Sequence, residues 1–542
     1  MHRITRRAAA ALAVPALALT GLIATSTPAS AAAADPAPAA AGTAWLTAQL
    51  TDGLIHNDQY DFTDYGLSVD AGLAFAAVGD ADAADTVSTA LAANITSYTE
   101  PGFGTTLSAG GVAKAIVLAQ AAGDDPTSYG GQDLVTQLES TVATAGANEG
   151  RIQDSFDPAS ASDYANVLGQ AYAAQGLVEA DSDSAAAVTD FLVDQQCDAG
   201  WFRLYFSKPG AATQTCDADP ESIPDTDATA IALMALVSMH DDALVPVIDK
   251  AETWLLSTQK ASGAWGGGKS TKGPNANSTG LAGWALAELG GDDAAVANAA
   301  AWVRGHQLTN VANCVYFADA DRGAIAYNTN AVDAAGATPI DAEKQDQFRR
   351  ATTQALPVLQ YAPVGDGDRN VLFAPDYVKA GSTVSVGVIG ATPGEALCAM
   401  MGEESVLGFA SALGEAHLPV ILLKKPGKST ITVANVDGPF GTADVTALGA
   451  KKLGLSIKGK VAVGAKQVVK VRGLAPGEMV SVTVKWPSTG HSASGEGTGG
   501  QANGKGVFTT SFKAPNKPGT AKVKVTGAFG NRKASKTFTV TR

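Results

Sequence analysis

The chain has 542 residues, too many for one ordinary hydrophobic core, so several domains are expected. Its formal net charge of −15 conceals two ends of opposite sign. From Lys451 onward the net charge is +15, whereas residues 32–450 carry −33. No segment beyond the N-terminus approaches the length of a membrane span, so we expect no transmembrane segment, and we expect no nucleic-acid partner.

The N-terminus has the pattern of a secretory signal peptide. A short basic stretch precedes an apolar, alanine-rich run at 8–24 that is too short for a membrane span. The small residues at 29–31 suit a signal peptidase, so we expect a signal peptide at 1–31 and a disordered linker at 32–42. The mature protein is therefore expected to be secreted, either released or held non-covalently at the cell wall.

Residues 43–361 are rich in alanine and repeat one helical pattern. Small and apolar residues fill five helices, most of which close with Gly and acidic residues, at 68–80, 110–125, 163–176, 227–242 and 277–293. Between them lie more polar helices such as Val247–Gln259 and Ala295–Gln307. An apolar helix needs burial all round, whereas an amphipathic one can face water. Two concentric rings meet both requirements, with the apolar helices inside and the amphipathic helices outside. A helix at Ala342–Leu356 within 307–361 would supply the sixth hairpin.

From Val364 the pattern changes to the period-two alternation of β-strands, with Gly and Pro in the turns. The segment GATPGEAL at 390–397 matches GLAPGEMV at 473–480, which indicates two related modules. Their lengths fit Ig-like sandwiches at 364–450 and 451–542. The sequence therefore predicts a multidomain fold: an all-α (α/α)6 toroid followed by two all-β Ig-like sandwiches.

The basic character of the last module has two interpretations. A lysine-rich module outside the cell is suited to electrostatic tethering to anionic envelope polymers. Alternatively, the lysines keep an all-β module soluble and protect its edge strands from pairing. Both interpretations stay open at this stage.

Four cysteines in an exported chain favour disulfides over a metal site or a catalytic thiol. Cys197 and Cys216 bracket an aromatic-rich loop, where a bridge is worth ~3 kcal/mol in the loop-entropy model. The remaining pair, Cys314 and Cys398, would join the helical region to the first β-module. We predict both disulfides, and neither a metal nor a cofactor.

Two segments resemble the Gln/Trp repeat of the squalene cyclase and prenyltransferase superfamily: QKASGAW at 259–265 and, more loosely, QCDAGWF at 196–202. The segment PDTDATA at 224–230 resembles the helix that carries the catalytic aspartates of squalene-hopene cyclases. The resemblance spans residues 43–361 and implies a terpenoid cyclase-like α/α-toroid. Protein prenyltransferase β-subunits, complement-like thioester domains and vitamin B12 carriers share this toroid, so the fold does not select an activity.

The resemblance places Asp227 at the middle position of the cyclase motif DxDD, whose aspartic acid protonates an alkene, and Asp225 at its first position. The last aspartate of the motif is Ala228 here. Aromatic residues make up only 6% of the chain, although a carbocation cascade needs aromatic faces. Those cyclases also use two α-barrels, and only one fits here. The alternative is that Asp227, like Asp163 and Asn277, is a helix N-cap. A catalytic role for Asp225 and Asp227 is thus expected only if the protein is an enzyme.

Other activities of this fold need motifs that can be checked directly. A zinc-dependent prenyltransferase needs Asp, Cys and His ligands, and the sequence has no DxC pair with a matching downstream His. A thioester needs a GCGEQ-like turn, which is absent. A glycan lyase or hydrolase needs convergent polar side chains and stays open. Its candidate residues are Asp64, Tyr65, Asp163, Tyr164, Arg203 and Tyr327.

The mouth of the toroid, where the inner helices begin, is expected to gather polar and aromatic side chains around a central funnel. The ligand-binding residues that we predict there are Asp64, Tyr65, Asp163, Tyr164, Asn277 and Trp265. Trp265 has a structural alternative, which is to pin its loop to a neighbouring helix. We interpret the chain as a secreted, non-catalytic protein that binds a small molecule, glycan or peptide at this mouth. The alternative is an exported enzyme, either a terpene cyclase-like isomerase using Asp227 or a glycan lyase or hydrolase.

Overall fold

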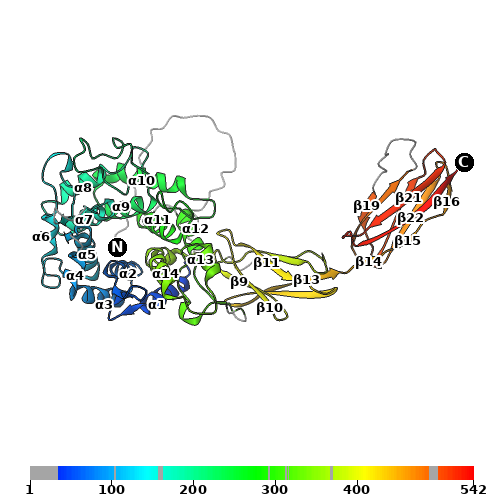
Figure 1. Cartoon of the computed structure of the whole chain (residues 1–542), viewed down its shortest axis with the longest axis horizontal. Coiled ribbons are helices and arrows are strands. Elements are labelled where there is room, and N and C mark those ends of the chain that lie inside the picture. The colour runs from blue at the N-terminus through cyan, green and yellow to red at the C-terminus, as the bar shows by residue number, and fades with distance from the viewer. Residues whose placement is uncertain are drawn as a thin grey trace, which may run out of the picture.

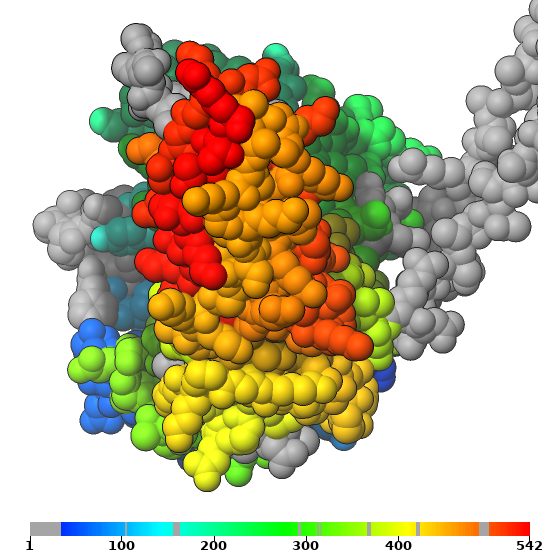
Figure 2. Space-filling model, turned by 90° about the vertical axis from the view of Figure 1, so that its right-hand side faces the viewer, coloured from blue at the N-terminus to red at the C-terminus, as the bar shows by residue number. Residues whose placement is uncertain are grey.

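The computed structural model describes residues 34–542 except for short gaps at 103–104, 157–162, 291–292, 312–313, 315, 366–369 and 487–497. The signal peptide expected at 1–31 lies outside the described residues. Figure 1 shows a ring of helices at one end of the molecule, followed by two β-modules along its long axis. In Figure 2 the second β-module, orange to red, stands in front of the rest of the chain. Among the described residues no helix combines the length and apolarity that a membrane crossing needs.

The inner ring of the helical part consists of α2 (Tyr65–Ala77), α5 (Ala109–Ala122), α7 (Val167–Glu179), α9 (Thr226–Ser238), α11 (Ala276–Leu289) and α14 (Ala342–Ala355). Each of these helices packs against the next, and α14 packs against α2, so the ring is closed. Alanine and glycine bring the helices close together: the backbones of Gly110 in α5 and Gly169 in α7 nearly touch, and Gly280 in α11 lies against Ala355 in α14.

The outer ring consists of α1 (Ala37–Thr47), α3 (Ala81–Ala92), α6 (Leu134–Glu139), α8 (Ala185–Val193), α10 (Val245–Thr258) and α12 (Asp293–Arg304). Each outer helix packs against an inner one, which gives the expected (α/α)6 toroid. The short elements between the hairpins are β1 (Leu50–Thr51), β2 (Leu54–Asn57), β3 (Phe62–Thr63), α4 (Ile95–Thr99), β4 (Thr105–Leu107), β5 (Ser155–Phe156) and α13 (Thr329–Ala334).

The sixth hairpin is assembled from the two ends of the helical region. Helix α1 packs against α14 and against the 3-10 helix at Pro357–Tyr361 that follows it. The disordered linker expected at 32–42 was therefore wrong from Ala37 onward, where α1 begins. Proline near a helix start fits because the first amides have no intrahelical partner. The carboxylate of Asp35 also fixes this end, at 2.6 Å from a guanidinium nitrogen of Arg304.

A glutamine at the end of an outer helix connects it to the next outer helix. The side-chain amide of Gln259 donates to the carbonyl oxygens of Gly263, at 3.0 Å, and Ala295, at 2.9 Å. The side-chain amide of Gln196 donates in the same way to the carbonyl oxygens of Gly200 and Val247. That of Gln307 donates to the carbonyl oxygens of Gly323 and Pro38. The first two cases are the repeats that the sequence indicates. The third was missed because 16 residues, rather than four, separate Gln307 from its glycine.

The first β-module has a five-stranded sheet of order β10-β9-β12-β13-β7 and a three-stranded sheet of order β11-β8-β6. Its strands are β6 (Val371–Phe373), β7 (Tyr377–Lys379), β8 (Thr383–Ile389), β9 (Ala396–Met401), β10 (Glu404–Phe409), β11 (Glu415–Leu422), β12 (Gly427–Asn435) and β13 (Gly438–Leu448). One hydrophobic cluster draws on both sheets, because alternate residues such as Val384, Val386 and Val388 point into it.

The second β-module repeats this topology. Its strands are β14 (Lys451–Lys452), β15 (Gly454–Ser456), β16 (Lys460–Ala462), β17 (Lys466–Arg472), β18 (Met479–Lys485), β19 (Thr498–Gln501), β20 (Val507–Lys513), β21 (Gly519–Thr526) and β22 (Arg532–Thr541). One sheet has the order β14-β22-β21-β18-β19 with β16 also on β22, and the other has the order β15-β17-β20. In both modules an early strand, β7 or β16, pairs in parallel with the last strand. The relation expected from the matching turns is thereby confirmed.

The helical ring and the first β-module are joined by covalent and polar contacts. The disulfide Cys314–Cys398 links them, and Cys197–Cys216 closes a loop within the ring, so both expected pairings are present. The Arg304 guanidinium donates to the carbonyl oxygens of Pro363, at 2.8 Å, and Pro393, at 3.0 Å. The first module is thus held against the end of α12.

Candidate functional site

The centre of the ring contains a cavity of about 490 Å³ that all six inner helices line. One lining residue from each helix is Asp70, Val117, Tyr172, Met234, Trp284 and Gln354. The cavity volume lies within the range of roughly 300–1,000 Å³ that is typical of ligand sites. It extends from the middle of the helices to their C-terminal ends, where Glu288 and His240 lie. The sequence placed the binding site at the opposite end, where the helices begin.

An ion pair joins two neighbouring inner helices beside the apolar part of this cavity. Lys114 of α5 pairs with Asp70 of α2, and their side chains are 16% and 21% exposed. The ammonium group also donates to the carbonyl oxygen of Gly66 at 3.3 Å and lies 5.9 Å from the centre of the Tyr172 ring. Burial raises the pKa of the Tyr172 hydroxyl, and the negative charge of Asp70 adds to the effect. Tyr172 therefore stays neutral beside this ion pair.

A second charged group lies at the mouth of the ring. Arg350 of α14 reaches Asp64 at 2.7 Å and Asp346 at 2.8 Å. Asp64 is the N-cap of α2, where its carboxylate accepts from the amide of Leu67 at 2.9 Å. The expected ligand-binding residue Asp64 is therefore at the mouth, but its carboxylate already has two partners in the protein.

Asp227 is not a helix cap. The N-cap of α9 is Asp225, whose carboxylate accepts from the amide of Ala228 at 3.0 Å. Asp227 lies two residues further on, within the first turn. It precedes Ile231 by four residues and Met234 by seven, so all three share the helix face that lines the cavity.

The cap assignments for Asp163 and Asn277 were also wrong. Asn166 caps α7, and Asn275 caps α11. Each true cap precedes the first apolar turn of its helix in an extended backbone conformation, which sequence reading locates only to within a few residues. Asn277, like Asp227, lies one residue inside its helix instead.

The first turns of α9 and α11 carry buried polar side chains whose hydrogen bonds are incomplete. Asp227 Oδ1 and Asn277 Oδ1 have no hydrogen-bond partner among the described residues, although the Asn277 amide nitrogen donates to Gln354 Oε1 of α14 at 2.6 Å. Burial raises the pKa of Asp227 to about 6; the Ser278 hydroxyl lowers it and the charge of Asp225 adds to the rise. The glycine-rich loop at 266–268 packs here, since a Cβ at Gly267 would lie 2.8 Å from Ser278 Oγ and 3.3 Å from Asp227 Oδ2.

The free energy of unfolding is expected to depend on pH through Asp227. The ordinary pKa of its side chain is 3.8, and the pKa in the folded chain is about 6, so the unfolded state loses the proton first. Stability should therefore fall as the pH rises from about 4 to 6, by ~2–3 kcal/mol. The variant Asp227→Asn cannot ionise, so we expect it to exceed the parent in stability at pH 7 but not at pH 3.5. Urea unfolding at both pH values measures this, and a difference independent of pH would contradict the assignment.

The remaining predicted residues lie away from the cavity. Asp163 pairs with Arg151 at 2.7 Å, Tyr164 is 70% exposed, and Tyr65 is the first residue of α2. Trp265 is 1% exposed, and its indole donates to the carbonyl oxygen of Leu255 at 2.9 Å, as its structural interpretation requires. None of the six predicted ligand-binding residues lines the cavity.

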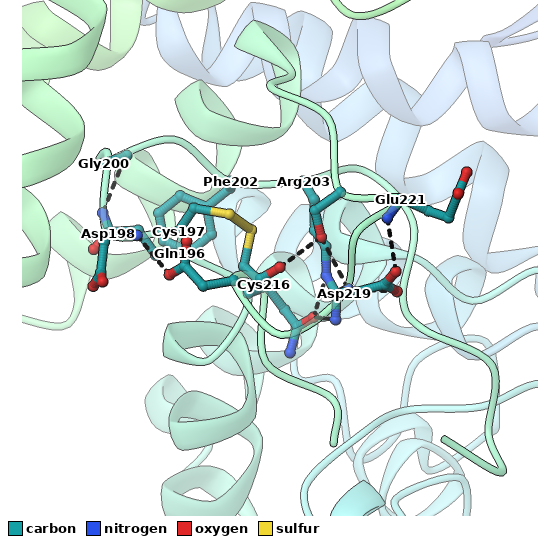
Figure 3. Close-up of a disulfide and its surroundings, with 12 residues drawn as sticks. Gln196, Cys197, Asp198, Gly200, Phe202, Arg203, Cys216, Asp219 and Glu221 are labelled. Atoms are coloured by element: carbon teal, nitrogen blue, oxygen red, sulfur yellow. Dashed lines mark hydrogen bonds and ion pairs between the residues drawn. A yellow bond between two sulfur atoms is a disulfide. The ribbon is translucent and has the colours of Figure 1, made fainter. Parts of the chain in front are cut away.

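The loop closed by the disulfide Cys197–Cys216 contains a buried arginine, Arg203 (Figure 3). Arg203, a candidate for lyase chemistry, is 2% exposed. Its guanidinium donates to Gln195 Oε1, at 2.7 and 3.0 Å, and to Asp219 Oδ2 at 3.2 Å. The disulfide Cys197–Cys216 lies beside it (Figure 3). Arg203 therefore fixes the loop.

Four residues of the site were not predicted from the sequence: Lys114, Arg350, Tyr172 and Trp284. A usable signal existed for Lys114, because it is the one charge in the alanine-rich helix AGGVAKAIVLAQAA. No comparable signal marks Arg350, which lies in a generally polar helix. Within the described ranges no group of three or more His, Cys, Asp or Glu side chains could hold a metal ion.

No protein-family model matches the chain, and no curated protein matches it. Among solved structures, the type II terpene cyclase MstE from Scytonema has 17% identity and a TM-score of 0.42, over 60% of this chain and 96% of that one. Unsaturated glucuronyl hydrolase from Bacillus sp. GL1 has 12% identity and a TM-score of 0.39, over 59% and 94%. The ent-copalyl diphosphate synthase from Streptomyces platensis has 15% identity and a TM-score of 0.35, over 56% and 51%.

Proposed function

We propose that this chain is a binding protein that takes a small, largely apolar molecule into the central cavity of its helical ring. The observation that carries the proposal is the cavity of about 490 Å³, to which every inner helix contributes side chains. Its middle is apolar, with Val117, Ile231, Met234, Leu281 and Trp284. Burial of apolar ligand surface against such a wall supplies about 25 cal/mol per Å².

The polar side chains of Asp227 and Asn277 indicate that one end of the ligand is polar. Asp227 and Asn277 lie on the faces of α9 and α11 that continue into the cavity through Ile231 and Leu281. Their unpartnered oxygens accept hydrogen bonds, and an unmade bond of this kind costs about 1–3 kcal/mol. A ligand that carries a hydroxyl or amino donor at one end would satisfy them.

Binding can be tested with the neutral dye N-phenylnaphthylamine, whose fluorescence rises in apolar surroundings. The full chain is expected to bind it saturably. Val117→Phe fills the cavity from α5 and should weaken binding at least tenfold, because the dye then clashes with the new ring. The matched control Val245→Phe lies on the exposed surface of α10, where Val245 is 45% exposed, and should bind like the parent. Equal affinity of the parent and the Val117 variant would refute the cavity as the site.

A second candidate function is an enzyme that uses Asp227 as a general acid. The observation in its favour is the carboxyl group with a pKa near 6 and an unpartnered oxygen, because such a group is partly protonated near neutral pH. A terpene cyclase-like reaction would use that proton on an alkene. Incubation with a linear polyene, followed by mass spectrometry, tests it. Cyclised product from the parent but not from Asp227→Asn would favour the enzyme over the binding protein.

We also propose that the protein is extracellular and that both β-modules are Ig-like. Two disulfides are compatible with an oxidising compartment. The shared strand order, with two facing sheets and an early strand parallel to the last one, is typical of Ig-like sandwiches. In this proposal the basic second module holds the ring near an anionic envelope.

A further inference from the structure

One broad face of the second β-module carries only lysine and hydroxyl side chains along its two central strands. On β21 the outward residues are Thr520, Lys522, Lys524 and Thr526, and on β22 they are Lys533, Ser535, Thr537 and Thr539. The inward residues between them, such as Val523 and Val525, are buried in the hydrophobic cluster. This surface, which we call the lysine face, also includes Lys485, Thr483 and Ser481 of β18.

The strand register brings the cations of this face together. Lys485 lies directly opposite Lys522, and Lys522 and Lys524 are ~6.8 Å apart along β21. At the edge, Lys452 of β14 lies beside Lys533. Like charges directly opposite one another destabilise a sheet. A bound anion would relieve this repulsion, so the lysine face suits an anionic partner.

No acidic side chain among the described residues of this module neutralises the charge. The described part of the module holds one acidic side chain, Glu478, which is fully buried in an ion pair with Arg532 at 2.7 Å. No other ion pair involves a described residue of this module. The lysine face thus presents a positive field to solvent, and counterions or a partner must balance it.

We infer that the lysine face binds a linear polyanion in which phosphodiester groups alternate with polyol units. Lysine ammonium groups meet phosphate oxygens, while the serine and threonine hydroxyls between them can exchange hydrogen bonds with the polyol. Proteins that bind single-stranded nucleic acid use aromatic side chains as stacking platforms. The outward positions of β21 and β22 supply none, which favours a polyol phosphate over a nucleic acid. This inference rests on the tethering role proposed above: the lysine face is the tethering surface and the polyol phosphate is its partner.

The test measures binding of poly(glycerol phosphate) to the full chain at several salt concentrations. The triple variant Lys485→Thr, Lys522→Thr, Lys524→Thr is expected to lose on the order of tenfold in affinity at 0.1 M salt. The slope of log affinity against log salt should fall by about 2, because fewer counterions are released. Threonine suits an exposed strand, so the variant should fold.

The matched control removes the same charge from the opposite sheet, with Lys466→Thr, Lys470→Thr and Lys513→Thr. This control should bind within about twofold of the parent. A second variant, Lys485→Arg, Lys522→Arg, Lys524→Arg, keeps the charge and should retain binding. Equal losses in both threonine triples would overturn the lysine face while leaving a tether by overall charge. If the parent does not bind poly(glycerol phosphate), both the lysine face and the tether by overall charge are overturned.

Two further outcomes would assign the face to a different partner. Tighter binding of oligo(dT) than of poly(glycerol phosphate) at equal charge would overturn the polyol phosphate in favour of nucleic acid. Sedimentation of the full chain at low salt tests a second copy, because the helical ring of one chain is acidic. Salt-sensitive dimers that the lysine-face triple abolishes would overturn the inference in favour of self-association.

Discussion

Replacing Arg532 by methionine is expected to destabilise the second β-module by ~3–5 kcal/mol. Two guanidinium nitrogens of Arg532 donate to the two carboxylate oxygens of Glu478, both at 2.7 Å. The arginine side chain is 5% exposed and the glutamate side chain 0%. Removing the arginine leaves a buried carboxylate without its counterion, which is the costly half of such a pair. Hydrogen–deuterium exchange of β21 and β22 measures the loss within this module alone.

The double variant Arg532→Met, Glu478→Leu provides the control. Replacing both members of a buried ion pair by apolar residues is often neutral. We therefore expect the double variant to recover most of the stability that the single variant loses. If the double variant is no more stable than the single one, lost packing of Arg532, and not the orphaned charge, explains the effect.

The same pair predicts a pH dependence. Burial opposes the charge of Glu478, but hydrogen bonds from Arg532 and from the amides of Ala475 and Ala528 bring its pKa below the ordinary 4.5. A lowered pKa stabilises the fold above the unfolded value and loses that contribution as the pH falls through the folded value. Protection of the parent module should therefore decline below about pH 4.5, and the double variant should lack this decline.

Gly263→Ala is the second substitution with a large expected effect. Gly263 adopts a φ of +90°, and a Cβ there would lie 2.4 Å from the carbonyl oxygen of Asn298 in α12. The left-handed conformation costs alanine about 1–2 kcal/mol. Displacing the neighbouring helix adds about 1–3 kcal/mol. Gly263→Ala should therefore lower the free energy of unfolding, measured with urea, by several kcal/mol.

Gly290→Ala separates these two contributions. Gly290 also has a left-handed backbone, with a φ of +67°, but a Cβ there would meet nothing within 4 Å. It should lose only the conformational part, about 1–2 kcal/mol. If both variants lose the same free energy, the close approach of the Gln259–Gly263 turn to α12 contributes nothing to stability.

The ring could be predicted because burial imposes a strong pattern on its inner helices. A helix enclosed on all sides must be apolar all round, so α9 and α11 stand out as runs of small and apolar residues. Helix α1 was missed because its Ala/Pro composition looks disordered, and it packs against α14 and the 3-10 helix at Pro357–Tyr361, about 300 residues away. Such long-range packing leaves no local trace in the sequence.

The cavity was harder to predict than the ring. Its wall combines residues from each of six helices, and their facing depends on how each helix is rotated. The spacing from Asp227 to Ile231 and Met234 indicates which face of α9 lines the cavity. The acidic motif at 225–227 instead predicts a site at the start of the helix. The disulfides were predicted because a chain with four cysteines leaves few pairings.

The closure of the ring by both ends of the helical region has a practical consequence. Asp35 lies against Arg304, which also binds the carbonyl oxygens of Pro363 and Pro393. The first described residues therefore pack at the junction between the ring and the first β-module. A bulky tag joined directly to Asp35 would strain three segments at once. A tag after Arg542, at the far end of the molecule in Figure 1, would leave that junction untouched.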